Sequence, residues 1–299
     1  MRLASLGYTA LKLAGVTAVA RRLRRNGIVL CYHNVIPEAD AGLWSSLGLH
    51  MPVATFARQM RWLAAAYDVI PLEHVVDRLA SGKSLRGTAA VTFDDAYAGV
   101  FEHAVPLLHD LGLPATVFVV AQPPGEDADF WWDHPAVLRA QSPTQHWYWL
   151  NAMRGDGTAI VGSLAQGNGA PLVRPPPACR PAPWPTIADA LRRDIRIGVH
   201  STTHRSLPTL DEIDLHREVI DSRDVIAHRT GIMPEFFAYP YGLWSDGVRS
   251  VVRSAGYRAA FTLEHRHSNG TDPWTIPRLN VPAGIGDATF QAWTAGLHP

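Results

Sequence analysis

The chain has 299 residues, of which 47% are apolar and 18% charged, and its formal net charge is zero. This apolar content is enough to build a sizeable buried core, so the composition argues against a disordered protein. The zero net charge argues against a nucleic-acid-binding protein, because neutralising phosphates requires a basic face.

Residues 1–25 differ in charge from the rest of the chain. They hold six basic residues and no acidic one, whereas residues 26–299 carry a net charge of −6. Apolar residues at helical spacing precede an arginine cluster, which predicts a basic amphipathic leader helix that could contact a membrane surface. The alternatives are a secretory signal cleaved after Ala18-Val19-Ala20 and a disordered leader. No stretch approaches the ~20 apolar residues that a spanning helix needs, so we expect a cytoplasmic or peripheral membrane protein, with export as the alternative.

From residue 27 onward, short apolar runs alternate with segments of helical periodicity. The apolar runs predict buried strands, and their alternation with helices predicts a mainly parallel sheet closed or partly closed into a β/α barrel. The expected fold class is therefore α/β, with residues 26–299 as one domain. The predicted strands are Gly27–Tyr32, Ala89–Phe93, Ala115–Val120, Ile195–Val199, Phe236–Tyr239 and Tyr257–Thr262, and the predicted helices cover residues 54–65, 73–81, 99–112, 211–229 and 246–255.

Residues 121–186 interrupt this alternation, and we interpret them as an insertion in the barrel domain. A short helix is expected at Phe130-Trp131-Trp132-Asp133. Prolines then crowd between Pro171 and Pro185, a composition that disfavours helix and central strand. The sequence therefore predicts that the insertion ends in an extended surface segment.

Polar side chains follow several of the predicted strands. His33 follows the first strand, Asp94 and Asp95 the second, and His200 the fourth. In β/α barrels, chemistry takes place at the carboxyl ends of the strands. We therefore expect these side chains to meet at one end of the barrel.

Asp94, Asp95, His200 and His204 form a candidate metal site. Two adjacent carboxylates at a strand end point in different directions, so one can bind a metal while the other faces substrate; taken alone, the pair could also be a solvated turn or a helix cap. Imidazoles four positions apart can meet one metal ion, although two surface histidines would show the same spacing. With Asp95, they offer two nitrogen ligands and one oxygen ligand, which suits zinc or a similar ion with open positions.

The fifth predicted strand ends at Tyr239, and Pro240-Tyr241-Gly242 follows it. Proline fixes φ and glycine permits a tight turn, so the backbone N–H of Tyr241 could be held facing a cavity. A fixed N–H can stabilise the oxyanion of a tetrahedral intermediate. An ordinary turn is the alternative.

Together, TFDD (92–95), HSTTH (200–204) and AYPYG (238–242) resemble, in that order, the motifs of the polysaccharide deacetylase family, the NodB-homology domain of carbohydrate esterase family 4. The resemblance covers roughly residues 27–282 and implies a distorted (β/α) barrel. It implies a hydrolase that removes N-acetyl groups from a carbohydrate polymer containing N-acetylglucosamine. It also implies one divalent metal ion, for which we expect zinc, with cobalt or nickel as alternatives.

The resemblance implies a role for each motif residue. Asp94 resembles the general base, and Asp95 resembles the metal-binding aspartate. His200 and His204 match the two metal-binding histidines, and Tyr241 falls where the family places its oxyanion-hole N–H.

The chain departs from the family pattern at three points. Ala96 follows the aspartate pair in place of the usual glycine, and a left-handed backbone there would cost alanine roughly 1 kcal/mol. Ala238 stands where an arginine usually positions the base, and Arg278 is our candidate substitute. The late histidine motif that supplies the general acid is not clearly present. His33 is our candidate for that role, as in the poly-N-acetylglucosamine deacetylase branch, and a structural histidine is the alternative.

Further residues are candidates for substrate binding. Trp131, Trp132 and Trp244 could stack on sugar rings or could instead pack in the protein, and Pro240 and Arg278 complete the candidate set. Two other functions stay open at this point: a hydrolase of the same fold that acts on a small N-acyl metabolite, and a catalytically silent glycan-binding relative.

Overall fold

The structure is a computed structural model that describes residues 2–44, 48–122, 129–165, 174–263 and 272–297. Within these residues, nine strands form one parallel sheet, with β4 paired to β5 beside the main path β10-β9-β8-β7-β6-β5-β1-β11. Two further strands, β2 and β3, pair with each other. The strands are β1 (Ile28–Tyr32), β2 (Asn34–Ile36), β3 (His50–Pro52), β4 (Asp68–Val69), β5 (Thr88–Phe93), β6 (Ala115–Val119), β7 (Ile195–Val199), β8 (Phe236–Ala238), β9 (Ala259–Thr262), β10 (Ile276–Pro277) and β11 (Leu279–Asn280).

The two end strands of the sheet, β10 and β11, are separated in the chain by Arg278 alone. Ile276 of β10 pairs with Phe261 of β9, and Leu279 of β11 pairs with Leu30 of β1. The segment from 276 to 280 therefore joins both edges of the sheet, and the sheet curves into a nearly closed barrel. The predicted α/β fold with a distorted (β/α) barrel is confirmed.

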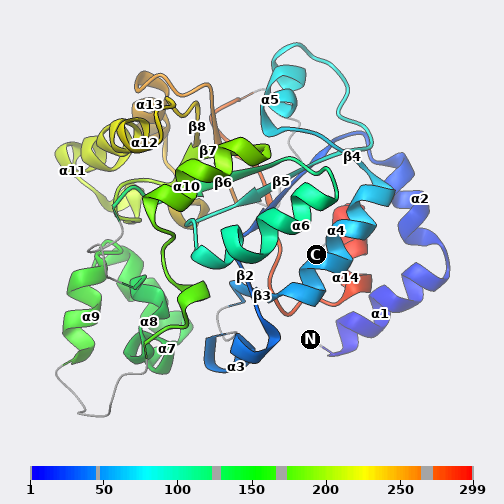
Figure 1. Ribbon diagram of the computed structural model, residues 1–299, viewed down its shortest axis with the longest axis horizontal. Helices are drawn as coiled ribbons and strands as arrows, with labels where there is room; N and C mark the ends of the chain where they lie inside the picture. Colours follow the sequence, from blue (N-terminus) through cyan, green and yellow to red (C-terminus); the bar gives the residue numbers. More distant parts are fainter. Residues whose placement is uncertain (1, 45–47, 123–128, 166–173, 264–271, 298–299) are drawn as a thin grey trace.

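Helices cover the outside of the barrel (Figure 1). Helix α4 shows why the sequence places them there, because Phe56, Met60 and Leu63 recur on one face and are fully buried, whereas the opposite face is exposed. The helices are α1 (Arg2–Leu13), α2 (Val16–Leu23), α3 (Ala41–Trp44), α4 (Val53–Ala66), α5 (Leu72–Ala80), α6 (Val105–Asp110), α7 (Pro135–Ala140), α8 (Pro143–Asn151), α9 (Gly157–Ala165), α10 (Trp184–Ala190), α11 (Glu212–His216), α12 (Ser222–Thr230), α13 (Asp246–Ser254) and α14 (Asp287–Thr294).

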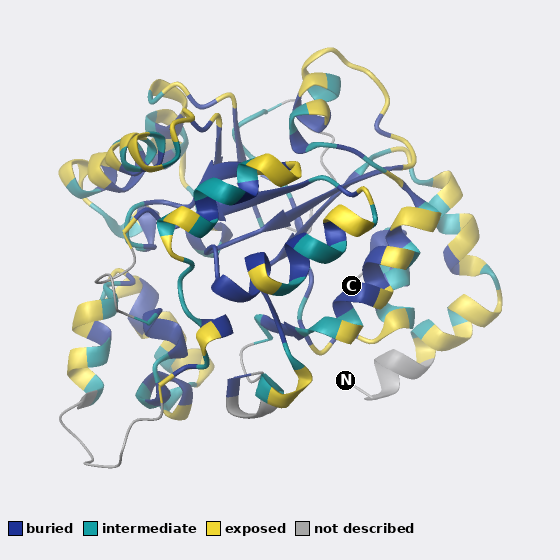
Figure 2. Cartoon of the chain, in the orientation of Figure 1, coloured by how far each residue is buried: buried dark blue, intermediate teal, exposed yellow. Residues whose placement is uncertain are grey.

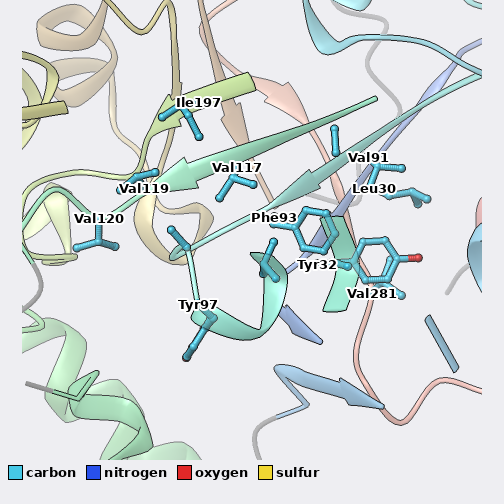
Figure 3. Packing of buried hydrophobic residues seen from close by; sticks show 14 of the residues in the cluster. Leu30, Tyr32, Val91, Phe93, Tyr97, Val117, Val119, Val120, Ile197 and Val281 are labelled. Carbon is cyan, nitrogen blue, oxygen red and sulfur yellow. The ribbon is translucent and has the colours of Figure 1, made fainter. Parts of the chain in front are cut away.

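The core divides along the faces of the strands, because neighbouring residues of a strand point to opposite sides. Leu30, Val91 and Val117 come from three adjacent strands and belong to the larger cluster, as Figure 3 shows. Val29 and Ala90, one residue earlier on their strands, belong to a second cluster together with residues of α5. Both faces of the strands are therefore buried, which accounts for the continuous apolar runs in the sequence (Figure 2).

The insertion differs from the prediction. The short helix expected at 130–133 is present as a 3-10 helix, Trp131–Asp133, but three helices that were not predicted, α7, α8 and α9, follow it. Residues 171–173 lie outside the described residues, but the expected extended surface segment is wrong for 177–179, which form a turn with Ala178 and Cys179 buried. The prolines stand in the first turns of this segment and of α7, α8 and α10, where a missing N–H costs nothing.

The leader forms two helices in place of one, because Gly15 adopts a left-handed conformation with φ of 74° between α1 and α2. Both helices lie beside α14 at the edge of the molecule (Figure 1). Among the described residues, no helix is long and apolar enough to cross a membrane.

Candidate active site

The motif residues gather at the carboxyl end of the barrel. Asp94 and Asp95 follow β5, His200 follows β7, and Tyr241 follows β8. His33 lies between β1 and β2 at the same end. The parallel sheet thus brings together side chains that are up to about 200 residues apart in the chain.

Three ligand atoms converge in this group. Asp95 Oδ1 lies 3.6 Å from His200 Nε2 and 3.5 Å from His204 Nε2, and the two Nε2 atoms are 3.1 Å apart. All three side chains are buried, and Asp95 Oδ1 has no hydrogen-bond partner among the described residues. Two imidazole nitrogens and an unpartnered carboxylate oxygen that share one point form a donor set that fits a divalent cation.

Hydrogen bonds to neighbouring groups fix the two histidines. His200 Nδ1 lies 2.8 Å from the carbonyl oxygen of Ala238, which makes it a donor and leaves Nε2 as the free ligand atom. The Ser201 hydroxyl accepts from the His204 backbone N–H at 2.9 Å. Tyr241 donates its hydroxyl hydrogen to the His204 carbonyl oxygen at 3.0 Å. The His200 ring is therefore oriented by the end of β8, and the His204 backbone is held by Ser201 and Tyr241.

Glu218 orders the loop that carries both histidines. Its buried carboxylate accepts from the backbone N–H groups of Thr202 and Thr203, at 3.1 and 2.9 Å, and from the Thr203 hydroxyl. These bonds come from a π-helical turn, Arg217–Asp221, between α11 and α12. The sequence motifs contained no signal for this residue.

Left-handed backbone is concentrated at the site. The φ angles are 72° at Asp95, 64° at Ala96, 65° at Ser201, 61° at His204 and 59° at Tyr241. Such conformations cost residues other than glycine about 1–3 kcal/mol each and persist where the surroundings impose them. Ala96 thus adopts the conformation for which a glycine would be the easier residue.

Asp94 is held by Arg278, the residue between β10 and β11. Arg278 Nη1 lies 2.7 Å from Asp94 Oδ1, and Nη2 lies 2.8 Å from Oδ2, a bidentate pair with both side chains buried. Burial alone would raise the pKa of the Asp94 carboxyl, but Arg278, His200 and His33 hold that pKa well below its usual range. Asp94 is therefore ionised at neutral pH.

The three candidate metal ligands, Asp95, His200 and His204, are shifted toward their neutral forms, in contrast to Asp94. Burial, together with Asp94 and Asp133, raises the pKa of Asp95 well above its ordinary value. Burial lowers the pKa of His200 and, more strongly, that of His204. Both imidazoles are therefore neutral, the form that binds a metal, and a cation would relieve the cost of ionising Asp95.

His33 lies beside Asp94. One of its ring nitrogens, Cys31 Sγ and an Asp94 oxygen lie within 4.8 Å of one another. His33 is partly exposed, and burial of the ring is the main reason why its pKa falls to about 4, although Asp94 opposes this shift. The imidazole is therefore neutral at pH 7.

The tryptophans that were candidates for sugar binding differ in how far they are exposed. Trp131 and Trp132 are only 4% and 7% exposed, and the Trp132 ring packs against His204 with centroids 4.5 Å apart. These exposures favour packing roles for both side chains. Trp244 is partly exposed, and Arg249 lies over its ring. Pro240 is buried and begins the turn that holds Tyr241.

A buried polar network next to the ligands was missed from the sequence. Asp133 accepts a hydrogen bond from the Tyr97 hydroxyl at 2.7 Å and contacts His50 Nε2 at 2.9 Å. His50 Nδ1 in turn contacts Asn34 Nδ2 at 3.0 Å, and Trp132 Nε1 donates to the Tyr97 hydroxyl at 2.6 Å. The network supports Trp132, and through it the ring of His204. Its members come from separate segments of the chain, so no local motif marks them.

Comparisons with known proteins give one consistent result. The family model described as polysaccharide deacetylase matches residues 81–260. The putative polysaccharide deacetylase YxkH of Bacillus subtilis is 19% identical over 272 residues, which are 90% of this chain and 76% of that protein. The poly-beta-1,6-N-acetyl-D-glucosamine N-deacetylase of Staphylococcus aureus is 20% identical over 247 residues, covering 81% of this chain and 71% of that protein.

The fold has similar solved structures. The deacetylase PplD of Streptococcus pyogenes, solved in complex with acetate, superposes with a TM-score of 0.62 at 15% identity. The match covers 92% of this chain and 99% of PplD. At this identity the likeness concerns the fold.

Proposed function

The chain belongs to the polysaccharide deacetylase family, and on this premise we propose that it is a metal-dependent hydrolase that removes N-acetyl groups from an N-acetylglucosamine-containing polysaccharide. One observation carries the proposal: three metal-ligand atoms, from Asp95, His200 and His204, converge beside a carboxylate that Arg278 keeps ionised. The name of the S. aureus relative supports the substrate class, because it specifies poly-β-1,6-N-acetylglucosamine.

Asp95, His200 and His204 would hold one divalent ion, with zinc favoured by the two nitrogens and one oxygen of the donor set. When bound, such an ion acts as a Lewis acid toward the acetamide carbonyl and water. The protein fixes the ligands before binding through the Ala238 carbonyl and the Glu218 carboxylate. Little reorganisation is then needed when the ion enters.

Asp94 is placed to take the proton from the attacking water. Arg278 keeps this carboxylate ionised and holds both of its oxygens in a fixed plane. As the water oxygen adds to the acetamide carbon, the backbone N–H of Tyr241 stabilises the oxyanion. The left-handed φ of 59° at Tyr241 sets the direction of that N–H.

His33 is placed to protonate the leaving amine. Because its pKa is about 4, the ring must first receive a proton, and Asp94, which has just taken one from water, is its neighbour. The carbon–nitrogen bond then breaks as His33 gives that proton to the sugar nitrogen. The products are acetate and a free amino sugar.

Metal content tests the ligand assignment. We expect about one equivalent of zinc in the wild-type protein after replenishment and dialysis, and its loss in His200→Ala and His204→Ala. His228→Ala removes an exposed histidine of α12 and serves as the control. Wild-type protein without metal, or ligand variants that retain it, would contradict the assignment.

Acetate release tests the reaction. Poly-β-1,6-N-acetylglucosamine oligomers should release acetate with the wild-type protein, and Asp94→Asn should lose at least about 100-fold in turnover while its zinc stays bound. Release from a small N-acyl metabolite but not from oligomers would favour the other hydrolase. Binding of oligomers without any acetate would favour the catalytically silent glycan-binding protein.

A further inference from the structure

Helix α2 presents its apolar side to solvent. Val16, Val19 and Leu23 lie at helical spacing on one side, and their exposed fractions are 39%, 56% and 69%. Leu13, at the end of α1 three residues before Val16, is 83% exposed. A helix that only packs against a domain turns its apolar side toward the core, so the orientation of α2 is the reverse of the usual one.

Polar contacts hold α2 in this orientation. Thr17 is buried on the inner side, and Arg21 donates to the Ala66 carbonyl oxygen. Arg24, directly after the helix, donates to the Thr294 carbonyl oxygen at 2.9 Å and to the Asn26 carbonyl oxygen at 3.1 Å. The body of the protein thus binds the polar side of α2 and leaves the apolar side outward.

Basic side chains border the exposed apolar residues. Lys12, Arg22 and Arg25 are exposed, and residues 1–25 contain no acidic residue. Figure 2 shows exposed residues along both α1 and α2. We name this region the α2 surface; it comprises Leu13, Val16, Val19 and Leu23 with Lys12, Arg22 and Arg25.

We propose that the α2 surface docks the protein on an anionic lipid bilayer. A bilayer of this kind offers both parts of the complement, an apolar layer for the four aliphatic side chains and anionic headgroups for the three cations. A second copy of the chain fits less well, because a symmetric contact would bring like charges of the two α2 surfaces together. The inference is independent of the proposed catalytic reaction.

Docking through α2 would leave the candidate active site open to solution. Arg86, just before β5, donates to the Arg22 carbonyl oxygen, so α2 lies at the end of the barrel where the strands begin. Asp94 and the metal ligands lie at the opposite, carboxyl end. A polymer could then approach the site from the aqueous side while the protein is held at the surface.

Vesicle flotation with the full chain tests the proposal. The protein should float with vesicles of phosphatidylcholine and phosphatidylglycerol, and much less with pure phosphatidylcholine. The double variant Val19→Glu/Leu23→Glu should lower partitioning at least about 10-fold, since it places charge in the apolar layer. Ile213→Glu changes a side chain of α11 that is 66% exposed, and this control should float like the wild type.

A charge variant makes a second measurement. The triple variant Lys12→Gln/Arg22→Gln/Arg25→Gln should lower partitioning about 100-fold. Each cation near an anionic surface raises the partition coefficient about five-fold, and three cations are removed. These residues are exposed, so unchanged thermal melting is expected for this variant. Acetate release from soluble oligomers should also stay unchanged, which separates a failure of this proposal from a failure of the proposed reaction.

Three outcomes would overturn the proposal. One is equal flotation with both vesicle types, and another is equal loss in the Ile213→Glu control. The third is a dimer in light scattering that Leu23→Glu converts to a monomer, which would assign the α2 surface to a second copy of the chain.

Discussion

At the scale of single residues, the pair of Asp94 and Arg278 gives the sharpest prediction. Arg278→Gln removes the cation that keeps the carboxylate ionised, so the pKa of Asp94 should rise and a larger fraction should be protonated. The acid limb of the kcat/KM profile for acetate release should move to higher pH. Arg278→Lys keeps the charge without the bidentate geometry and should restore part of the activity.

Arg249→Gln is the matched control for this change. Arg249 pairs with Asp272 at 2.6 Å, and Asp272 is not among the site residues. This variant should leave the pH profile unchanged. An acid limb that stays in place in Arg278→Gln would contradict the assignment of Asp94 as the base that Arg278 controls.

The buried network gives a prediction for stability. Tyr97→Phe removes the hydroxyl that donates to Asp133 and accepts from Trp132, so both partners lose a buried hydrogen bond. We expect the free energy of unfolding to fall by about 1–3 kcal/mol in urea denaturation. Tyr148→Phe, at an exposed tyrosine, should change it by less than about 0.5 kcal/mol. If both variants lowered the free energy of unfolding by the same amount, the buried network would not contribute to stability as predicted.

The same network shows what sequence reasoning could reach at the site. Asp94, Asp95, His200 and His204 sit in short motifs after apolar strands, so they could be selected from local pattern alone. His50 and Asp133 meet across 83 positions of the chain, and Tyr97 and Asp133 across 36. Nothing near any of these residues specifies its partner, because the contact exists only once the barrel has formed.

At the scale of elements, the six predicted strands, which correspond to β1, β5, β6, β7, β8 and β9, were predictable because all of their residues are buried except Arg196 in β7. Strands β10 and β11 have two residues each, too few for any period to appear. Helix α10 was missed because the prolines between Pro171 and Pro185 were interpreted as excluding helix, whereas Pro185 stands in its first turn. For α8, Ser142 as N-cap before Pro143 was the available signal.

The turn after β8 gives a prediction at this scale. Gly242 has φ of 71°, and a Cβ there would lie 2.6 Å from the backbone nitrogen of Leu263. Gly242→Ala should therefore destabilise the protein by about 2 kcal/mol or more, from left-handed strain and overpacking together. It should also lower acetate release, because the preceding residue, Tyr241, is held by the same turn. Gly284→Ala, with open space and ordinary φ, should be nearly neutral in thermal melting.

At the scale of the whole molecule, the proposed metal ligands Asp95, His200 and His204 would link the stability of the fold to pH. They come from segments after β5 and β7, so an ion bound there connects distant parts of the barrel. In the metal-free protein, the pKa of Asp95 is raised, so ionising this carboxyl in the folded state costs free energy. This cost lowers the stability of the folded state at neutral pH. His204 has a lowered pKa, so its contribution to stability is present above the ordinary histidine pKa of about 6.5 and is lost as the pH falls below it.

Chelation should therefore lower thermal stability, and by an amount that depends on pH. If the ion is present at about 100 times its dissociation constant, its removal costs about 2.7 kcal/mol, which corresponds to a fall of about 5 °C in Tm. The difference between metal-loaded and chelated protein should be full at pH 7.5 and should shrink below about pH 6.5, because protonated imidazoles cannot bind the ion. His204→Ala should show no difference at any pH in differential scanning calorimetry. Two outcomes would contradict this assignment: an unchanged Tm when the chelator is added to the wild-type protein, or an equal fall in Tm in His204→Ala. Either result would mean that any bound metal lies elsewhere in the chain.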